Sequence, residues 1–294
     1  MKERLQKLLS ASGLCSRRAA EEWIIRGKVT VNGGLARLGD TADPALDEIR
    51  VEGRPLPAPP AATTTVLLYK PRGVVTTLQD EKGRPTVAAL LPPELGRLYP
   101  VGRLDQFSEG LLLMTNDGAL ANRLTHPKGE VNKTYRLWVS GWHEDALALL
   151  KRPIVLDGYR IKPPTVRLVW ARGGGMRNAE CKMQNETPVG GGVLDAPNPS
   201  RTETPVGGGV LDAPKLPRTE TPVARAICPP TTALLEITIH EGRNRQIRRM
   251  AEAAGLKTTR LQRVAEGPIQ LGDLKPGQWR LLTPEELAWL KMGD

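Results

Sequence analysis

The chain has 294 residues, enough to bury a sizeable core and more than one average domain, so we predict one small and one larger domain. Lys and Arg number 42 against 32 Asp and Glu, which gives a formal net charge of +10 and predicts a polyanionic partner. Since no apolar run reaches about 18 residues, nucleic acid fits this charge better than a position inside a membrane.

The first predicted elements are two short helices and a β-hairpin. The first helix covers residues 5–10, and the second is capped by Ser16 and ends before Gly27. A short strand then leads into Asn32-Gly33, a pair typical of a two-residue hairpin turn. Because such elements bury little surface, we predict a compact module whose use is determined by its basic side chains.

Basic side chains crowd the helical part of this module, residues 1–56. One such side chain alone is usually a solvated surface charge, but together they are candidate contacts to RNA phosphates. The candidate RNA-binding residues are Arg4, Lys7, Arg17, Arg18 and Lys28. The segment from Arg4 to Gly34 resembles the alpha-L, ribosomal-protein-S4-like RNA-binding domain in its Arg-Leu start, its Ser-Arg-Arg-Ala turn and its Val-x-Val-Asn-Gly hairpin. This resemblance implies RNA binding and is silent on catalysis.

Residues 57–65 are rich in proline and have no helical or strand period, which predicts a semi-rigid linker. A buried strand begins near residue 66 and runs into Lys70-Pro71. The second domain is therefore predicted to cover residues 66–294.

One carboxylate of the second domain has a setting typical of a catalytic group. Gly102-Arg103-Leu104-Asp105 forms a polar loop, residues 109–115 predict a strand, and an Asn-Asp-Gly turn then opens a helix. This order places Asp105 at the rim of a sheet as a nucleophile or general base, with Arg103 beside it to tune it or to contact a substrate. The four loop residues alone would also fit a turn with a surface ion pair.

Two later stretches carry further candidates. Residues 133–139 alternate, with Tyr135 on the apolar face, where a tyrosine is usually a core residue. Residues 234–240 alternate too and meet an Arg-rich string, in which Gly242 permits a tight turn before a helix. The buried stripe of that helix is predicted to be Ile247, Met250, Ala251 and Ala254. Four Arg within seven residues exceed what a solvated face needs, and suggest phosphate contacts plus one Arg directed at a carboxylate.

The three stretches resemble, in order, the motifs of RNA pseudouridine synthases of the RsuA/RluB type. In that family the Asp of the first motif is the nucleophile, which implies this role for Asp105. The Tyr of the second motif stacks on the target base and can move a proton, which implies these roles for Tyr135. The third motif, carried over position by position, makes Arg248 the expected ion-pair partner of Asp105. We treat Arg243 and Arg245 as substrate-binding candidates.

The implied reaction converts uridine to pseudouridine: the glycosidic bond breaks, the uracil turns, and it rejoins the ribose through carbon. No net redox change or hydrolysis occurs, so no cofactor is expected, and the scattered cysteines and histidines predict no metal site. An ionised Asp105, whose pKa an adjacent guanidinium is expected to keep low, could attack either the base or the anomeric carbon. Arg103 could fill the space that the extruded uridine leaves.

Residues 172–232 depart from the family pattern. A segment from Glu186 to Pro197 recurs from Glu203 to Pro214 with a period of 17 residues, and two copies cannot build a stacked core. Its Gly triplets and prolines predict a disordered or loosely held insertion. The strands on either side should still pair, because the cost of loop closure rises slowly with length.

The sequence thus predicts an α+β protein: a small helical and hairpin RNA-binding domain, followed by a synthase domain on a mixed, largely antiparallel sheet. The resemblance implies site-specific pseudouridine formation in ribosomal RNA, and the string from Thr125 to Lys128 favours large-subunit (23S) over small-subunit rRNA. A catalytically silent RNA-binding or ribosome-assembly factor is the alternative from another class. A phosphotransferase with an Asp nucleophile is disfavoured, because Asp105-Gln106-Phe107 lacks a second carboxylate for magnesium and the sequence has no P-loop glycine pattern.

Ribosomal RNA is the expected partner. We expect no membrane association and no protein partner, hence a monomer. The first residues lack the apolar core of a signal peptide, so a cytoplasmic location is expected.

Overall fold

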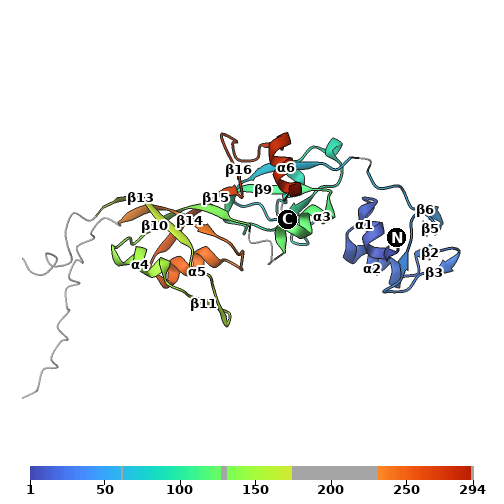
Figure 1. Ribbon diagram of the computed structural model, residues 1–294, viewed down its shortest axis with the longest axis horizontal. Coiled ribbons are helices and arrows are strands. Elements are labelled where there is room, and N and C mark those ends of the chain that lie inside the picture. Colours follow the sequence, from blue (N-terminus) through green and yellow to red (C-terminus); the bar gives the residue numbers. More distant parts are fainter. Residues whose placement is uncertain (61, 127–130, 174–230, 293–294) are drawn as a thin grey trace, which may run out of the picture. The chain divides into compact units, whose positions relative to one another are not determined.

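The computed structural model describes residues 1–60, 62–126, 131–173 and 231–292 (Figure 1). The described part of the predicted insertion is limited to its ends, so the repeats at 186–214 lie outside the described residues.

The N-terminal module holds two helices and two small sheets. Its elements are β1 (Glu3–Arg4), α1 (Leu5–Ala11), α2 (Arg17–Ile25), β2 (Val29–Val31), β3 (Gly34–Leu35), β4 (Thr41–Ala42), β5 (Ile49–Val51) and β6 (Arg54–Pro55). The backbone N–H of Ala19 donates to Ser16 Oγ at 3.1 Å, which confirms the predicted helix cap. Asn32 and Gly33 have φ values of 50° and 80°, so the predicted two-residue hairpin turn is also present.

The second domain is built on a nine-stranded sheet. Its strands are β7 (Thr65–Lys70), β8 (Tyr99–Val101), β9 (Glu109–Thr115), β10 (Lys133–Ser140), β13 (Thr165–Arg172), β14 (Thr232–Ile239), β15 (Lys257–Glu266), β16 (Ile269–Gln270) and β17 (Trp279–Leu281). The central order is β13-β14-β10-β15-β9-β7-β17. Within the described chain β9 and β15 are the one parallel pair, which confirms the predicted mixed, largely antiparallel sheet.

Helices cover both faces of this sheet. They are α3 (Gly118–Thr125), α4 (Asp145–Lys151), α5 (Gln246–Ala253) and α6 (Pro284–Met292), with 3-10 turns at Val87–Leu90 and Pro93–Leu95 and a small ribbon of β11 (Val155–Leu156) and β12 (Tyr159–Arg160). Alternate residues of β9 join different cores: Leu112 packs with α4 and α5, and Leu113 with α3 and α6. Figure 1 shows α4 and α5 together along β10 and β14, and α6 next to β9 and β16.

The elements that carry the candidate residues form largely as predicted. Tyr135 is buried on β10, and the predicted stripe of α5 is buried as well. Strands β13 and β14 pair as far as Arg172 and Thr232, which confirms that the strands flanking the insertion meet. The turn before α5 differs from expectation: the residue with a left-handed backbone is Arg245, with φ of 50°, and not Gly242.

Candidate active site

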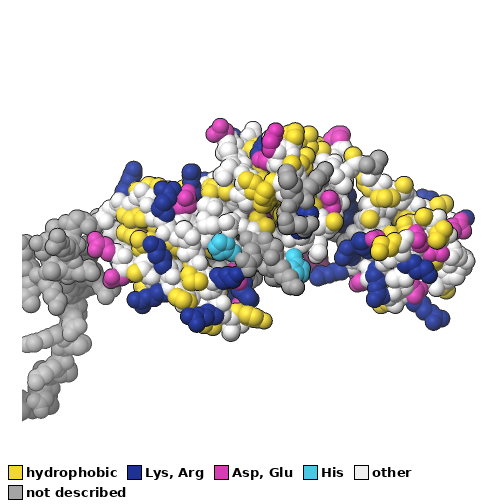
Figure 2. Space-filling view, in the orientation of Figure 1, with side chains coloured by type: hydrophobic (Ala, Val, Ile, Leu, Met, Phe, Trp, Pro, Cys, Tyr) yellow, Lys and Arg dark blue, Asp and Glu magenta, His cyan; other side chains and the backbone are white. Residues whose placement is uncertain are grey.

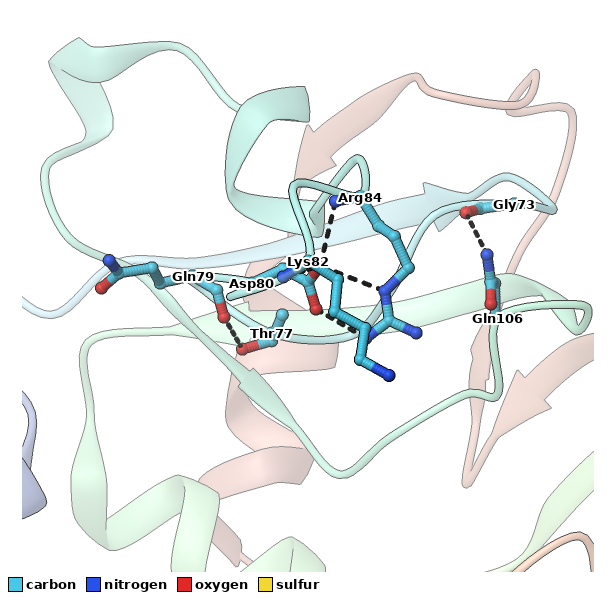
Figure 3. Close-up of polar contacts among 7 residues, drawn as sticks. All are labelled: Gly73, Thr77, Gln79, Asp80, Lys82, Arg84 and Gln106. Atoms are coloured by element: carbon cyan, nitrogen blue, oxygen red, sulfur yellow. Dashed lines mark hydrogen bonds and ion pairs between the residues drawn. The ribbon is translucent and has the colours of Figure 1, made fainter.

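The backbone around Asp105 is fixed by contacts from the segment that follows β7. Thr76 Oγ1 donates to the carbonyl of Leu104 at 2.7 Å. On the other side of Asp105, Gln106 and Gly73 exchange two hydrogen bonds, of 2.8 Å and 3.3 Å, the second of which is drawn in Figure 3. The loop is therefore held rigidly although its carboxylate is exposed.

Lys70, at the end of β7, anchors the same loop from inside the domain. Its side chain is completely buried, and Nζ donates to the carbonyls of Pro71 at 2.9 Å, Ser108 at 2.7 Å and Gln106 at 3.4 Å. Burial lowers the pKa of Lys70 to about 8, while the charge of Asp105 acts in the opposite direction. Lysine is rarely fully buried. A lysine at the end of a buried apolar strand is therefore the feature of the sequence that could have predicted this contact.

Arg248 holds the turn after Asp105 rather than the acid itself. Its Nη2 donates to the carbonyl of Phe107 at 2.9 Å and to Ser108 Oγ at 3.3 Å. The predicted ion pair is wrong in this structure: across the described ranges the Asp105 carboxylate makes no ion pair or hydrogen bond. The Asp105 side chain is also exposed. Its charge still reaches Arg248, because it raises the pKa of that guanidinium, which burial lowers.

A hollow of about 270 Å³ brings the candidate residues together. It is lined by Arg103, Asp105, Tyr135, Arg243 and Arg245, among others. Five of the six predicted catalytic and substrate-binding residues therefore converge from the loop before β9, from β10 and from the turn before α5, whereas Arg248 does not line this hollow. A second hollow, of about 300 Å³, shares Arg103, Tyr135 and Arg243 with the first.

The arginines of this site differ in how firmly they are held. Arg243 lies over the ring of Tyr159, with 4.0 Å between its guanidinium carbon and the ring centre, and its Nε lies 3.4 Å from Glu241. Arg103 and Arg245 are exposed, and neither side chain has a hydrogen-bond or ion-pair partner in the part of the chain that the structure describes. Free guanidinium groups beside a carboxylate suit the binding of an anionic substrate.

A charged loop before Asp105 adds a third hollow, of about 360 Å³, which Arg103 and Asp105 also line. Asp80 fixes this loop by accepting the backbone N–H groups of Lys82 and Arg84 at 3.1 Å and 2.9 Å, and the Arg84 guanidinium at 2.6 Å (Figure 3). The Arg84 side chain and these N–H groups lower the pKa of Asp80 to about 2. This loop belongs to none of the motifs predicted from the sequence.

The basic residues of the N-terminal module are not all free. Arg4 donates to the Gly39 carbonyl, Lys7 pairs with Glu3, and Lys28 Nζ lies 2.6 Å from Glu52. Arg17 and Arg18 are exposed without a side-chain partner among the described residues. Figure 2 shows Lys and Arg side chains on this module alongside acidic and hydrophobic ones. Arg17 and Arg18 are thus the members of the predicted set that are free to contact phosphates.

The described residues offer no metal-binding cluster and no membrane-spanning helix. No three His, Cys, Asp or Glu side chains there gather in a way that could hold a metal ion. No described helix is both long and apolar enough to span a membrane.

Comparison with known proteins gives matches along nearly the whole chain. Residues 64–253 match the RNA pseudouridylate synthase family, and residues 3–45 match the S4 domain. The chain is 35% identical over 290 residues to ribosomal large subunit pseudouridine synthase B of Bacillus subtilis (strain 168), covering 98% of this chain and 96% of that protein. It is 34% identical over 293 residues to an uncharacterised RNA pseudouridine synthase of Aquifex aeolicus (strain VF5), covering 99% and 94%. A crystal structure of a pseudouridylate synthase superposes with a TM-score of 0.56 at 25% identity, covering 98% of this chain and 99% of the other.

Proposed function

The chain belongs to the RNA pseudouridylate synthase family, and on this premise we propose that it isomerises specific uridines of large-subunit ribosomal RNA with Asp105 as the nucleophile. The observation that carries the proposal is the contrast at Asp105. Its carboxylate is free and lines the hollow that holds Tyr135, while the backbone on both sides of it is fixed. A nucleophile needs this combination, because the reacting oxygen must be available and its position must vary little.

Each predicted site residue has a role in the proposed reaction. Asp105 attacks the base or the anomeric carbon of a uridine that has left its stack. Tyr135 lies against the extruded uracil and takes part in removing its carbon-bound proton. Arg248 fixes the turn after Asp105, Arg103 fills the space that the uridine leaves, and Arg243 and Arg245 bind the flanking phosphates. The uracil then joins the ribose through carbon and the bond to Asp105 breaks, so the carboxylate is released and the product is an isomer of the substrate.

The choice of RNA is supported by similarity. The Bacillus subtilis relative named for the large ribosomal subunit aligns over nearly the full length of both chains. The S4 domain supplies an RNA-binding module whose Arg17 and Arg18 are exposed. Large-subunit rRNA is therefore the substrate that we propose.

The test compares the pseudouridines of both ribosomal RNAs in cells with and without this gene. Loss of a defined position in large-subunit rRNA, restored by the wild-type gene, is the expected result. Asp105→Asn keeps the shape of the side chain but not its nucleophilicity, so it should not restore the modification, although the purified variant still binds the RNA. Asp157→Asn, an exposed carboxylate outside the three hollows, is the matched control and should restore it.

Three outcomes would contradict the proposal. A lost position in small-subunit rRNA would show that the substrate is wrong. No lost position would favour a silent RNA-binding factor. Pseudouridine formation by pure Asp105→Asn protein would exclude Asp105 as the nucleophile.

A further inference from the structure

Behind Tyr135 lies a buried pair of opposite charges on β15. Arg263 and Glu266 are each 1% exposed, and Nη1 of Arg263 lies 3.5 Å from Oε2 of Glu266. Oε1 of Glu266 lies 3.6 Å from Nζ of Lys133, its cross-strand partner on β10. Burying such charges costs solvation free energy that apolar side chains of similar size would not lose. A buried pair kept at this cost points to a functional use.

A β-bulge brings both charges to the side of Tyr135. The pairing of β10 with β15 shifts between Thr134 and Tyr135, where Val264 is an extra residue on β15. Residues three apart in a regular strand point to opposite faces. With the extra residue, Arg263 and Glu266 share the face on which Tyr135 lies, as their contact requires.

Arg263 also links the two halves of the proposed active site. Strand β15 lies between β9, which follows Asp105, and β10, which carries Tyr135. Arg263 Nε donates to the carbonyl of Leu111 on β9 at 2.6 Å, and Tyr135 is the cross-strand partner of Arg263 on β10. The backbones of β9 and β15 approach so closely that a Cβ at Gly110 would lie 2.2 Å from the carbonyl oxygen of Arg263.

The pair keeps unused hydrogen-bonding capacity next to Tyr135. Within the described chain, Arg263 Nη2 and Glu266 Oε2 are buried and have no hydrogen-bond partner. Both residues line the second hollow together with Tyr135. The pKa of the Tyr135 hydroxyl is raised above its ordinary value, first by burial and further by the Glu266 carboxylate, and the adjacent Arg263 guanidinium opposes this rise.

We propose, resting on the function proposed above, that Arg263 is a positioning residue for Tyr135: it directs the hydroxyl into the hollow and stabilises it as the phenolate, while Glu266 holds the guanidinium in place. The phenolate then takes the proton from C5 of the rejoined uracil. The electron pair of the C5–H bond forms the C5=C6 double bond, and the electron pair of the C6=N1 double bond moves onto N1. N1 then gains a proton from water, and the phenol returns its proton to water. Protons and electrons balance, as an isomerisation requires.

Other charged groups also face Tyr135. Asp105 raises the pKa of Tyr135 from the loop before β9. The remaining charged or titratable side chains that line the two hollows with Tyr135 are Arg103, His126, Lys133, His240, Glu241, Arg243 and Arg245. Variants that change only Arg263 or Glu266 leave these other groups in place. Differences between the variants and the wild type therefore report the effects of Arg263 and Glu266 on Tyr135.

The test measures the pH dependence of pseudouridine formation by the full-length protein on an rRNA transcript. Arg263→Gln removes the cation, so kcat should fall by about tenfold or more with little change in KM, and the rise of activity with pH should move to higher pH. Glu266→Gln leaves the guanidinium unneutralised, so the same rise should move to lower pH. Arg263→Lys keeps the charge without the forked geometry and should recover part of the rate.

A matched control separates this effect from general damage to the fold. Glu109→Gln also removes a buried carboxylate, one that is bound by Arg260 on the neighbouring strand and lines none of the three hollows. It should leave the pH dependence in place even if it lowers stability. Shifts in the same direction for Arg263→Gln and Glu266→Gln, or a similar shift for Glu109→Gln, would overturn the inference.

A second readout does not depend on activity. Carbon-13 NMR of labelled tyrosine gives the titration of the Tyr135 hydroxyl, with its signal assigned from Tyr135→Phe. Its midpoint should rise in Arg263→Gln and fall in Glu266→Gln, and an unchanged midpoint in both would overturn the inference. If the wild-type protein makes no pseudouridine, the proposed function fails, but this titration still decides whether Arg263 acts on Tyr135.

Discussion

Two basic side chains, those of Lys70 and Arg248, hold the backbone around Asp105 by separate contacts. Lys70 binds backbone carbonyls from inside the domain, and Arg248 binds the next turn from helix α5. Neither contact touches the Asp105 carboxylate, so the acid stays free while its backbone is fixed from two sides. Removing either cation should therefore change the rate more than it changes RNA binding.

The contribution of Arg248 can be measured against its neighbour. Arg248→Ala leaves the Phe107 carbonyl without its donor, so we expect single-turnover pseudouridine formation to slow by about 10- to 100-fold. Arg248→Lys should recover only part of the rate, because one ammonium cannot reproduce both contacts. Arg249 pairs instead with the exposed Asp157, at 2.7 Å and 3.0 Å, so Arg249→Ala should change the rate little. Equal losses in both alanine variants would contradict these roles.

Lys70 predicts a pH dependence of stability. Its pKa in the folded protein is about 8, below the ordinary value, so at more alkaline pH the unfolded chain binds more protons at this residue than the folded chain does. The contribution of Lys70 to stability should therefore increase as the pH rises above 8. Urea unfolding at pH 7 and at pH 9.5 should show that wild-type protein gains stability relative to Lys70→Met at the higher pH. A constant difference between the two proteins would refute this assignment.

At the scale of elements, the parallel contact between β9 and β15 depends on Gly110. Its φ is 104°, and an added Cβ would lie 2.2 Å from the Arg263 carbonyl oxygen. We expect Gly110→Ala to lower the free energy of unfolding by about 2 kcal/mol or more, because strain and a backbone clash add. Gly242→Ala is the control: Gly242 lacks a positive φ and has open space around its Cβ position, so its melting temperature should stay near that of the wild type.

Periodic elements could be predicted from the sequence because their residues face a core at fixed intervals. Strand β10 and helix α5 bury the side chains that alternation and helical spacing indicate. The partner of Arg248 could not be predicted in this way, since whether it meets a carbonyl or the Asp105 carboxylate depends on packing between distant segments. The same holds for Arg263, whose burial depends on a bulge and on a glycine about 150 positions earlier in the chain.

At the scale of the whole molecule, the repeat-containing segment joins the sheet away from the proposed active site. Strand β14 begins at Thr232, where the segment ends, and leads at its other end into the turn before α5. Eight residues of extended strand separate the two ends by roughly 20 Å. Arg172 and Thr232 are register partners, so a shorter connection can also close this strand pair.

Deletion of Glu186–Thr219, two full 17-residue periods, should therefore leave both the fold and the reaction intact. A shorter connection between Arg172 and Thr232 costs no more loop entropy than the natural one, and the residues that line the hollow of Asp105 are unchanged. Melting temperature and pseudouridine formation on full-length rRNA should both remain close to wild-type values. Deletion of the single period Glu203–Thr219 shortens the connection by half as much and is the matched control for its length. If both deletions lowered the melting temperature in proportion to the number of residues removed, the segment would be part of the folded domain. If the melting temperature stayed the same but the modification were lost, the segment would have a role in binding the RNA.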